Sequence, residues 1–198
     1  MSILQINASI RGADSASSAL ASEISARLHD ANPTCPIQLL DVGASPLPLL
    51  DNEFLGAHFA PVGQRSAAQQ ALVDRTDQAI AQVQAANFVV IGVPMYNFAV
   101  PAQLKSWFDA VARAGVTFRY TDGGPQGLLT GKKVYLALAR GGIYPANEDP
   151  QLPWLLRMLA FIGLSDVTTV RAEGLAMGQA VSIAAMQSAR EQISALKL

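Results

Sequence analysis

The stretch Phe88-Val89-Val90-Ile91-Gly92-Val93 is a continuous apolar run that ends at Pro94. A short run of this kind, rich in β-branched residues, is typical of a strand that is buried on both faces. Such strands occur mainly in parallel sheets whose two faces are covered by helices. We therefore expect this run to form a buried strand of an α/β fold.

Four further short apolar segments flank this strand in the sequence and are also predicted to be strands: residues 3–8, 37–42, 133–139 and 166–172. The segments between them favour helices. Leu20, Ile24 and Leu28, for example, are spaced four residues apart, and this helix is expected to end before Asn32-Pro33. Other helices are expected around residues 72–83, 101–113 and 153–162, and from residue 179.

Strands that alternate with helices indicate parallel pairing through right-handed crossovers. We therefore predict an α/β, doubly wound parallel sheet of five strands with helices on both faces, in the flavodoxin-like order 2-1-3-4-5. Residues 1–198 are expected to form a single domain. Residues 43–63, with Pro46, Pro48 and Pro61, are too long for a plain connection, which favours a functional or interfacial role.

Composition limits the classes of partner. The 14 Lys and Arg residues against 15 Asp and Glu residues leave a net charge of -1, which argues against nucleic-acid binding. Residues 78–104 carry no charge, but their amides and prolines disfavour a membrane span, and the N-terminus lacks a signal-peptide pattern. Cys35 is the only cysteine, so no internal disulfide is possible. We expect a cytoplasmic location.

Several familiar catalytic patterns are missing. His29 and His58 have no partner at metal-binding spacing, so we predict no metal site and expect both to be surface residues. The chain has no Gly-x-Ser-x-Gly, and residues 127–133 are one residue short of a Walker A loop. No Gly-x-Gly-x-x-Gly follows the first strand, which disfavours dinucleotide wrapping.

The loop after the first strand is rich in hydroxyl groups, namely those of Ser9, Ser15, Ser17 and Ser18. Hydroxyls and backbone N–H groups that converge at a helix N-terminus suit a terminal monophosphate. The alternative is simple N-capping of the following helix by Asp14 or Ser15. The carboxylate of Asp14 would repel a phosphate unless it points away.

The loop after residues 88–93, Met95-Tyr96-Asn97-Phe98, combines two rings, a thioether and an amide. Rings and sulfur offer stacking surface, and the amide offers a donor and an acceptor, so the loop suits a flat heteroaromatic ligand. The alternative is that Tyr96 and Phe98 are core residues.

The loop after residues 133–139 contains Arg140-Gly141-Gly142. The two glycines allow backbone N–H groups to approach a ligand, and Arg140 can offset negative charge on a ring. The alternative is a plain Gly-Gly turn. Because parallel strands place their carboxyl ends at one edge of the sheet, the three loops together favour flavin mononucleotide (FMN) as the ligand.

Segments along nearly the whole chain resemble the family of FMN-dependent NADH-azoreductases and quinone reductases. They are Pro94–Phe98, Gln103–Lys105, Phe108-Asp109, Ala112–Thr121, Gly131–Lys133, Arg140–Ile143 and Phe161–Gly163. The resemblance implies a flavodoxin-like homodimer with one FMN per subunit and active sites at the subunit interface. It also implies ping-pong hydride transfer from NADH or NADPH through FMN to quinones and aromatic azo compounds, the latter cleaved to amines.

The resemblance also assigns site residues. FMN contacts fall on Ser9, Ser15, Ala16, Ser17, Met95, Tyr96, Asn97, Phe98, Ala139, Arg140, Gly141 and Gly142. Family members commonly have Ser at the position of Ala139, so a side-chain hydrogen bond is lost here. Tyr120, Phe161 and Phe59 are expected to line the substrate pocket. No side chain is needed as an acid or nucleophile, and Asn97 is expected to orient the ring.

Other functions fit parts of the sequence. A flavodoxin-type electron carrier is usually strongly acidic, so the net charge of -1 counts against it. An NADPH-dependent flavin reductase would share the Ser-x-Arg pattern seen in Ser9-Ile10-Arg11, and a non-redox nucleotide-binding regulator would bind no flavin. The sequence does not distinguish NADH from NADPH, and it does not identify the physiological acceptor.

Overall fold

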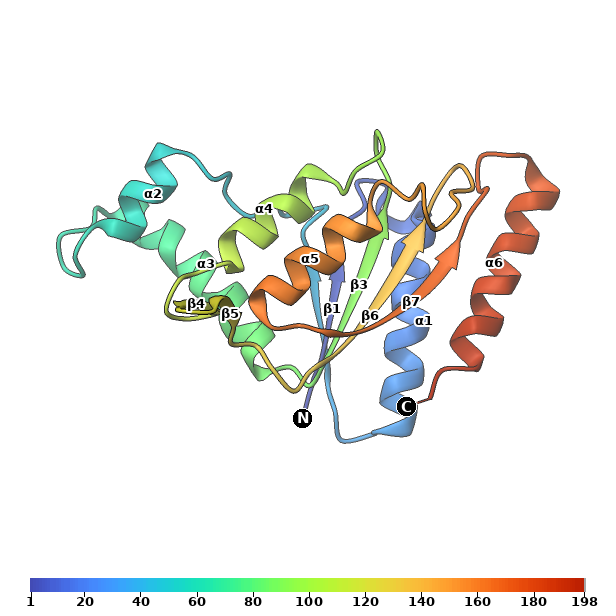
Figure 1. Cartoon of the computed structure of the whole chain (residues 1–198), viewed down its shortest axis with the longest axis horizontal. Coiled ribbons are helices and arrows are strands. Elements are labelled where there is room, and N and C mark those ends of the chain that lie inside the picture. The colour runs from blue at the N-terminus through green and yellow to red at the C-terminus, as the bar shows by residue number, and fades with distance from the viewer. Residues whose placement is uncertain (198) are drawn as a thin grey trace.

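A computed structural model describes residues 1–197 and contains one five-stranded parallel sheet (Figure 1). Its strands, in spatial order, are β2 (Ile37–Asp41), β1 (Ile3–Asn7), β3 (Phe88–Pro94), β6 (Lys133–Ala139) and β7 (Asp166–Ala172). This order is the predicted 2-1-3-4-5 arrangement when the five strands are numbered along the chain. The fold prediction is therefore confirmed.

The central strand β3 is buried because helices cover both faces of the sheet. Val89 and Ile91 pack into one core cluster, and Val90 packs into the other. The first cluster lies under α3 (Ala67–Ala85), α4 (Ala102–Val111) and α5 (Leu152–Ile162), and the second lies under α1 (Ala16–Ala31) and α6 (Gln179–Ser194). Figure 1 shows these two helical layers on either side of the sheet.

Helix α1 follows its predicted pattern and lies close to the sheet. Leu20, Ile24 and Leu28 are fully buried, and the helix ends at Ala31, before Asn32. A Cβ atom on Gly92 of β3 would lie 2.8 Å from the carbonyl oxygen of Ser17. The absence of a side chain at Gly92 therefore lets the N-terminus of α1 approach the centre of the sheet.

The segment 43–63 contains a helix that the sequence analysis did not predict, α2 (Asn52–Phe59). Asp51 caps it, since Asp51 Oδ1 accepts a hydrogen bond of 2.8 Å from Phe54 N–H. The helix packs on α3 and lies at the far left of Figure 1, away from the sheet.

Both histidines are half-buried rather than simple surface residues. His58 lies on α2, and its ring nitrogens contact the Phe54 carbonyl at 2.8 Å and the Thr76 hydroxyl at 2.9 Å. His29 Nδ1 lies 2.9 Å from the Cys35 carbonyl. The expectation of surface histidines was therefore wrong, because both rings satisfy buried backbone or hydroxyl groups.

The excursion after α4 is a separate antiparallel hairpin of β4 (Phe118–Thr121) and β5 (Gly124–Gly127). A short 3-10 helix, η1 (Gly12–Asp14), precedes α1. Within residues 1–197, no helix is long and apolar enough to cross a membrane. The same residues contain no group of three or more His, Cys, Asp or Glu side chains arranged to hold a metal ion.

Candidate functional site

The loops after β1, β3 and β6 enclose a pocket of about 160 Å³ at the carboxyl edge of the sheet. In Figure 1 these loops lie beyond the arrowheads of the strands. The pocket is lined by Ser9, Arg11, Ser15, Ala16, Ser17, Pro94, Met95, Tyr96, Ala139, Arg140, Gly141, Leu175 and Ala176. Most of the predicted cofactor contacts therefore lie together, whereas Asn97, Phe98 and Gly142 lie outside the lining.

One wall of the pocket carries hydroxyl groups. Ser15 Oγ lies 3.1 Å from Ser17 Oγ, and Ser9 Oγ lies 3.0 Å from the hydroxyl of Tyr96. All three serines are buried. The wall therefore joins the loop after β1 to the loop after β3.

Ser15 also caps α1, since its Oγ accepts a hydrogen bond of 3.1 Å from Ser18 N–H. The capping alternative is thus realised, but it does not exclude anion binding. The first N–H groups of a helix have no intrahelical acceptor, and the helix dipole adds positive potential there. The N–H groups of Ala16 and Ser17 begin this helix at the pocket.

Two charged residues flank the hydroxyl wall, and both line a neighbouring cavity with Ser15 and Ala16. Asp14 is exposed and does not line the pocket. Arg11, which the sequence analysis did not include among the contacts, does line it. The sequence feature that could have identified Arg11 is its position as a basic residue within a loop rich in hydroxyl side chains.

The second wall is the loop after β3, which forms a tight turn from Tyr96 to Ala99. Tyr96 N–H donates to Ala99 O at 3.0 Å, and Ala99 N–H donates to Tyr96 O at 3.1 Å. Asn97 and Phe98 have positive φ angles of 50° and 66°. A non-glycine residue in this left-handed region stores roughly 1–3 kcal/mol of strain, and such strain is typical of functional sites.

The turn exposes its tip. Phe98 has 66% of its surface exposed, so it is not a core residue, which removes that alternative for this ring. Asn97 is also exposed, whereas Met95 and Tyr96 are half-buried beside the pocket. The turn thus offers Met95 and Tyr96 to the pocket and presents Asn97 and Phe98 to its outer side.

The third wall follows β6 and includes Ala139, Arg140 and Gly141. The Arg140 guanidinium is fully buried and bonds to Asp149 Oδ2 at 2.7 Å and to Glu173 Oε1 at 3.0 Å. The role expected for Arg140, a positive charge available to a ring, is not what the structure shows. Two carboxylates already neutralise that charge behind the pocket.

Asp149 is held in its charged form despite its position. Burial alone would raise the pKa of its carboxyl group. Hydrogen bonds from Leu152 N–H, the Arg140 side chain and Gln151 N–H outweigh burial, so the pKa is lowered below its ordinary value. The ion pair therefore persists across the neutral pH range.

Two lining residues, Leu175 and Ala176, follow β7 and were missed by the sequence analysis. Leu175 N–H donates to Arg140 O, and Ala176 N–H donates to Gly141 O, each at 3.0 Å. These backbone bonds bring the segment against the loop after β6. Because neither residue carries a distinctive chemical group, no local sequence signal could have identified them.

The predicted substrate residues do not line this pocket in the single chain. Phe161 on α5 packs against Phe118, with ring centroids 4.3 Å apart. The ring centroids of Phe118 and Tyr120 are 5.5 Å apart. Tyr120 and Phe59 are 75% and 81% exposed. Tyr120 and Phe59 are therefore exposed outside the pocket, and Phe161 packs on the buried ring of Phe118.

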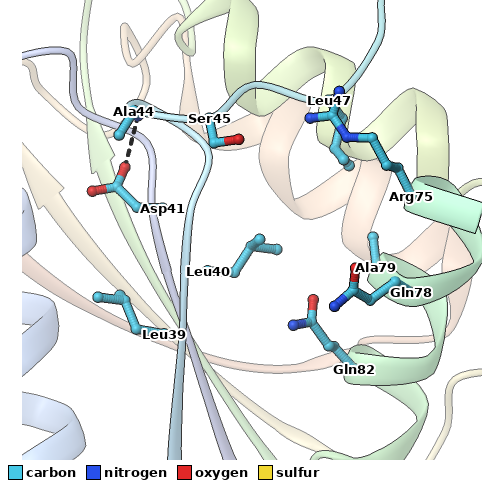
Figure 2. Close-up of a pocket in the computed structure, with 10 residues that line it drawn as sticks. All are labelled: Leu39, Leu40, Asp41, Ala44, Ser45, Leu47, Arg75, Gln78, Ala79 and Gln82. Carbon is cyan, nitrogen blue, oxygen red and sulfur yellow. Dashed lines mark hydrogen bonds between the residues drawn. The ribbon is translucent and has the colours of Figure 1, made fainter. Parts of the chain in front are cut away.

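A larger cavity of about 300 Å³ lies between β2 and α3 (Figure 2). Its charged side chains already have partners within the chain. Asp41 Oδ1 accepts from Ala44 N–H at 3.0 Å, and Arg75 Nη2 donates to Pro46 O at 2.8 Å. Both contacts hold the segment after β2 in place, so we do not assign the functional site to this cavity.

Comparisons with known proteins identify the family to which the chain is similar. A family model described as a flavodoxin-like fold matches residues 1–196. The FMN-dependent NADH:quinone oxidoreductase of Dechloromonas aromatica is 53% identical over 197 residues, which cover 99% of each chain. FMN-dependent NADH:quinone oxidoreductase 6 of Burkholderia lata is 48% identical over 194 residues, which cover 98% of each chain.

Solved structures of azoreductases also match nearly the whole chain. An azoreductase from Bacillus anthracis superimposes with a TM-score of 0.85 at 30% identity, covering 98% of this chain and 97% of that chain. An FMN-dependent NADH-azoreductase from Bacillus anthracis, solved in complex with FMN, has a TM-score of 0.84 at 27% identity and covers 98% of both chains.

Proposed function

The chain belongs to the family of FMN-dependent NADH:quinone oxidoreductases with a flavodoxin-like fold, and from this premise we propose that it binds FMN in the pocket at the carboxyl edge of the sheet. We propose further that it transfers hydride from NADH or NADPH to quinones. The observation that carries the proposal is the pocket itself, which joins a hydroxyl-lined helix N-terminus to the turn after β3.

The hydroxyl wall fits the phosphate of FMN. Ser9, Ser15 and Ser17 supply buried hydroxyls, and the first N–H groups of α1 supply donors at the positive end of the helix dipole. Arg11 adds a positive charge at the rim, and Asp14 does not line the pocket. This donor set is the chemistry that a phosphate dianion requires.

The other two walls fit a planar ring. Met95 and Tyr96 offer a thioether and an aromatic face on one side, and Ala139 and Gly141 offer a narrow backbone edge on the other. Ala139 has only a methyl group, so this position provides no side-chain hydrogen bond. Asn97, exposed at the tip of the turn, is proposed to orient the ring through its amide.

When bound, FMN supplies the capacity to accept a hydride from a nicotinamide and to pass it to a second substrate. The chain's own residues bind, orient and shield the reactants, so no side chain needs to act as a nucleophile. We propose a ping-pong order in which the nicotinamide leaves before the acceptor binds. Aromatic azo compounds are proposed as further acceptors, and cleavage to two amines would take two such cycles.

We propose that the active form is a homodimer with its sites at the subunit interface. The pocket of about 160 Å³ is smaller than the roughly 300–1,000 Å³ of typical ligand sites, so one chain encloses only part of a nucleotide. Phe59, Phe98 and Tyr120 are all more than half exposed, an arrangement that favours burial against another subunit. Phe59, Tyr120 and Phe161 would then line the substrate pocket.

We further propose that residues 1–198 act as one FMN-binding domain in the cytoplasm. Its only cysteine, Cys35, is buried and unpaired, which suits a reducing compartment. A strongly acidic surface, as used by flavodoxin-type carriers to steer towards partners, is not indicated by the net charge of -1. We therefore favour an enzyme over an electron carrier.

Initial-rate kinetics test this proposal. The rate of NADH oxidation is measured at several fixed NADH concentrations while the benzoquinone concentration is varied. Parallel lines in a double-reciprocal plot support the ping-pong order. Intersecting lines would exclude that order, and the absence of quinone-dependent turnover by the FMN-loaded protein would contradict the enzyme assignment.

A further inference from the structure

We propose that Gln151 is a positioning residue that holds the Tyr96–Ala99 turn in its strained conformation and thereby sets one wall of the FMN pocket. This inference rests on the proposed function, because it takes that pocket as the flavin site. Gln151 has only 1% of its surface exposed, and it does not line the pocket. Its effect on the ligand would therefore be exerted through the turn.

The side-chain amide of Gln151 forms hydrogen bonds at both ends of the loop after β3. Gln151 Nε2 donates to Pro94 O at 3.0 Å and to Ala99 O at 3.0 Å. Pro94 is the last residue of β3, and Ala99 closes the turn by accepting from Tyr96 N–H. One nitrogen with two N–H groups thus fixes the residues that flank Met95, Tyr96, Asn97 and Phe98.

The orientation of this amide follows from the chemistry of its neighbours. Arg140 has only donors, and its Nη2 lies 3.4 Å from Gln151 Oε1, so the amide oxygen must face the arginine. The amide nitrogen must then face the two carbonyls. Gln151 N–H also donates to Asp149 Oδ1 at 2.9 Å, and Asp149 holds Arg140 through the buried ion pair.

The Gln151 amide is paired through both its nitrogen and its oxygen, and another arrangement of this buried amide would leave one of them without a partner. The turn needs such support, since Asn97 and Phe98 are both held at positive φ. A shift of the turn would also move the Tyr96 hydroxyl away from Ser9 Oγ, 3.0 Å distant. Gln151 therefore influences the ring wall and the hydroxyl wall together.

The test compares Gln151→Leu with a matched control, Gln5→Leu. Leucine is similar in size to glutamine but cannot donate. Gln5 is also buried, at 5% exposure, and donates to Asn7 Oδ1 at 3.1 Å and to Ser22 Oγ at 2.9 Å, and it makes no bond to the turn. Gln151→Glu is a second variant that keeps an acceptor for Arg140 and lacks the N–H donors, in case the leucine variant does not fold.

The first readout is hydrogen–deuterium exchange of the FMN-free protein, followed at residues 95–100. We expect the Tyr96 and Ala99 amides to exchange about tenfold faster in both Gln151 variants, because two hydrogen bonds to the loop are lost, and to be unchanged in Gln5→Leu. Unchanged exchange in the Gln151 variants would overturn the proposal without any reference to FMN.

The second readout is the affinity for FMN and the absorption spectrum of the bound flavin. We expect the Kd for FMN to rise about tenfold in the Gln151 variants and the visible absorption band of the bound flavin to shift, while Gln5→Leu matches the wild type. An FMN Kd and spectrum identical to those of Gln5→Leu would show that Gln151 is only structural. Failure of the wild-type protein to bind FMN would instead overturn the proposed function, and with it this role of Gln151.

Discussion

Arg140 and Asp149 form an ion pair directly behind the pocket, with 2.7 Å between Arg140 Nη1 and Asp149 Oδ2 and both side chains buried. Removing the arginine would leave the buried Asp149 carboxylate with Arg171 Nη1, at 3.6 Å, as its remaining cationic partner. We expect Arg140→Met to lower the free energy of unfolding by about 3 kcal/mol, because one partner of a buried pair is lost. Urea denaturation measures this change.

The double variant Arg140→Met, Asp149→Asn provides the control for that experiment. It removes the charges of Arg140 and Asp149 but keeps an amide oxygen that can accept from Gln151 N–H and Leu152 N–H, so the destabilisation should be clearly smaller than in Arg140→Met alone. An equal or larger loss in the double variant would show that the pairing of charges is not the cause.

The lowered pKa of Asp149 predicts an acid dependence of stability. A carboxyl group whose pKa is lower in the folded than in the unfolded state, where it is about 3.9, stabilises the fold above that value. This contribution is lost as the pH falls from about 4 through the folded-state pKa. We expect Asp149→Asn to show a shallower fall in unfolding free energy below pH 4, measured by denaturation at a series of pH values. Identical slopes in the two proteins would refute this.

Ser17→Ala tests the hydroxyl wall. Its side chain points to Ser15 Oγ rather than capping the helix, so its removal leaves the cap of α1 in place. We expect the Kd for FMN to rise by at least about tenfold, since a hydrogen bond to a charged group contributes roughly 1.5–3 kcal/mol. Riboflavin, which lacks the phosphate, is the control ligand. A parallel loss of riboflavin affinity would mean that Ser17 does not contact the phosphate.

Asn97→Ala tests the proposed orientation of the ring. We expect the rate of hydride transfer from NADH, followed by stopped-flow absorbance, to fall by about tenfold while the fold is retained. Asn97→Gly separates the amide from the backbone, because glycine adopts the positive φ of 50° without strain. An unchanged rate in both variants would remove the Asn97 amide from the reaction.

Phe59→Asp tests the proposed subunit interface. Because Phe59 is 81% exposed, an aspartate there should not disturb the fold of one chain, but it should weaken an apolar interface. We expect sedimentation velocity to show a shift towards monomer. Ile183→Asp, at a 60% exposed position on α6, is the control and should leave the dimer intact. A Phe59→Asp protein with the same sedimentation as wild type would place the interface elsewhere.

The fold was predictable because its signals are local. The apolar run at residues 88–93 and the spacing of Leu20, Ile24 and Leu28 each reflect burial on a regular element. Helix α2 was not predicted, since prolines before it and after it resemble a loop, and its start depends on the cap by Asp51. Local apolar periodicity was weak in that segment.

The lining of the candidate pocket could be predicted only in part, for a physical reason. Ser9, Ser15, Ser17 and Tyr96 have recognisable chemistry and follow the ends of strands, so the topology brings them together. Side-chain contacts between residues far apart in the chain could not be predicted from the sequence. Arg140 pairs with Asp149, and the Gln151 side chain donates a hydrogen bond to Pro94 O. Both contacts depend on the path of residues 143–151, which no pattern in the sequence specifies.

The proposed activity requires that the pocket hold an FMN that exchanges hydride with small substrates. The most direct test is the absorbance of the FMN-loaded protein, kept anaerobic and titrated first with NADH and then with benzoquinone. We predict that NADH bleaches the visible flavin band and that benzoquinone restores it. A bound flavin whose spectrum does not respond to NADH or NADPH would contradict the claim and support an electron carrier instead.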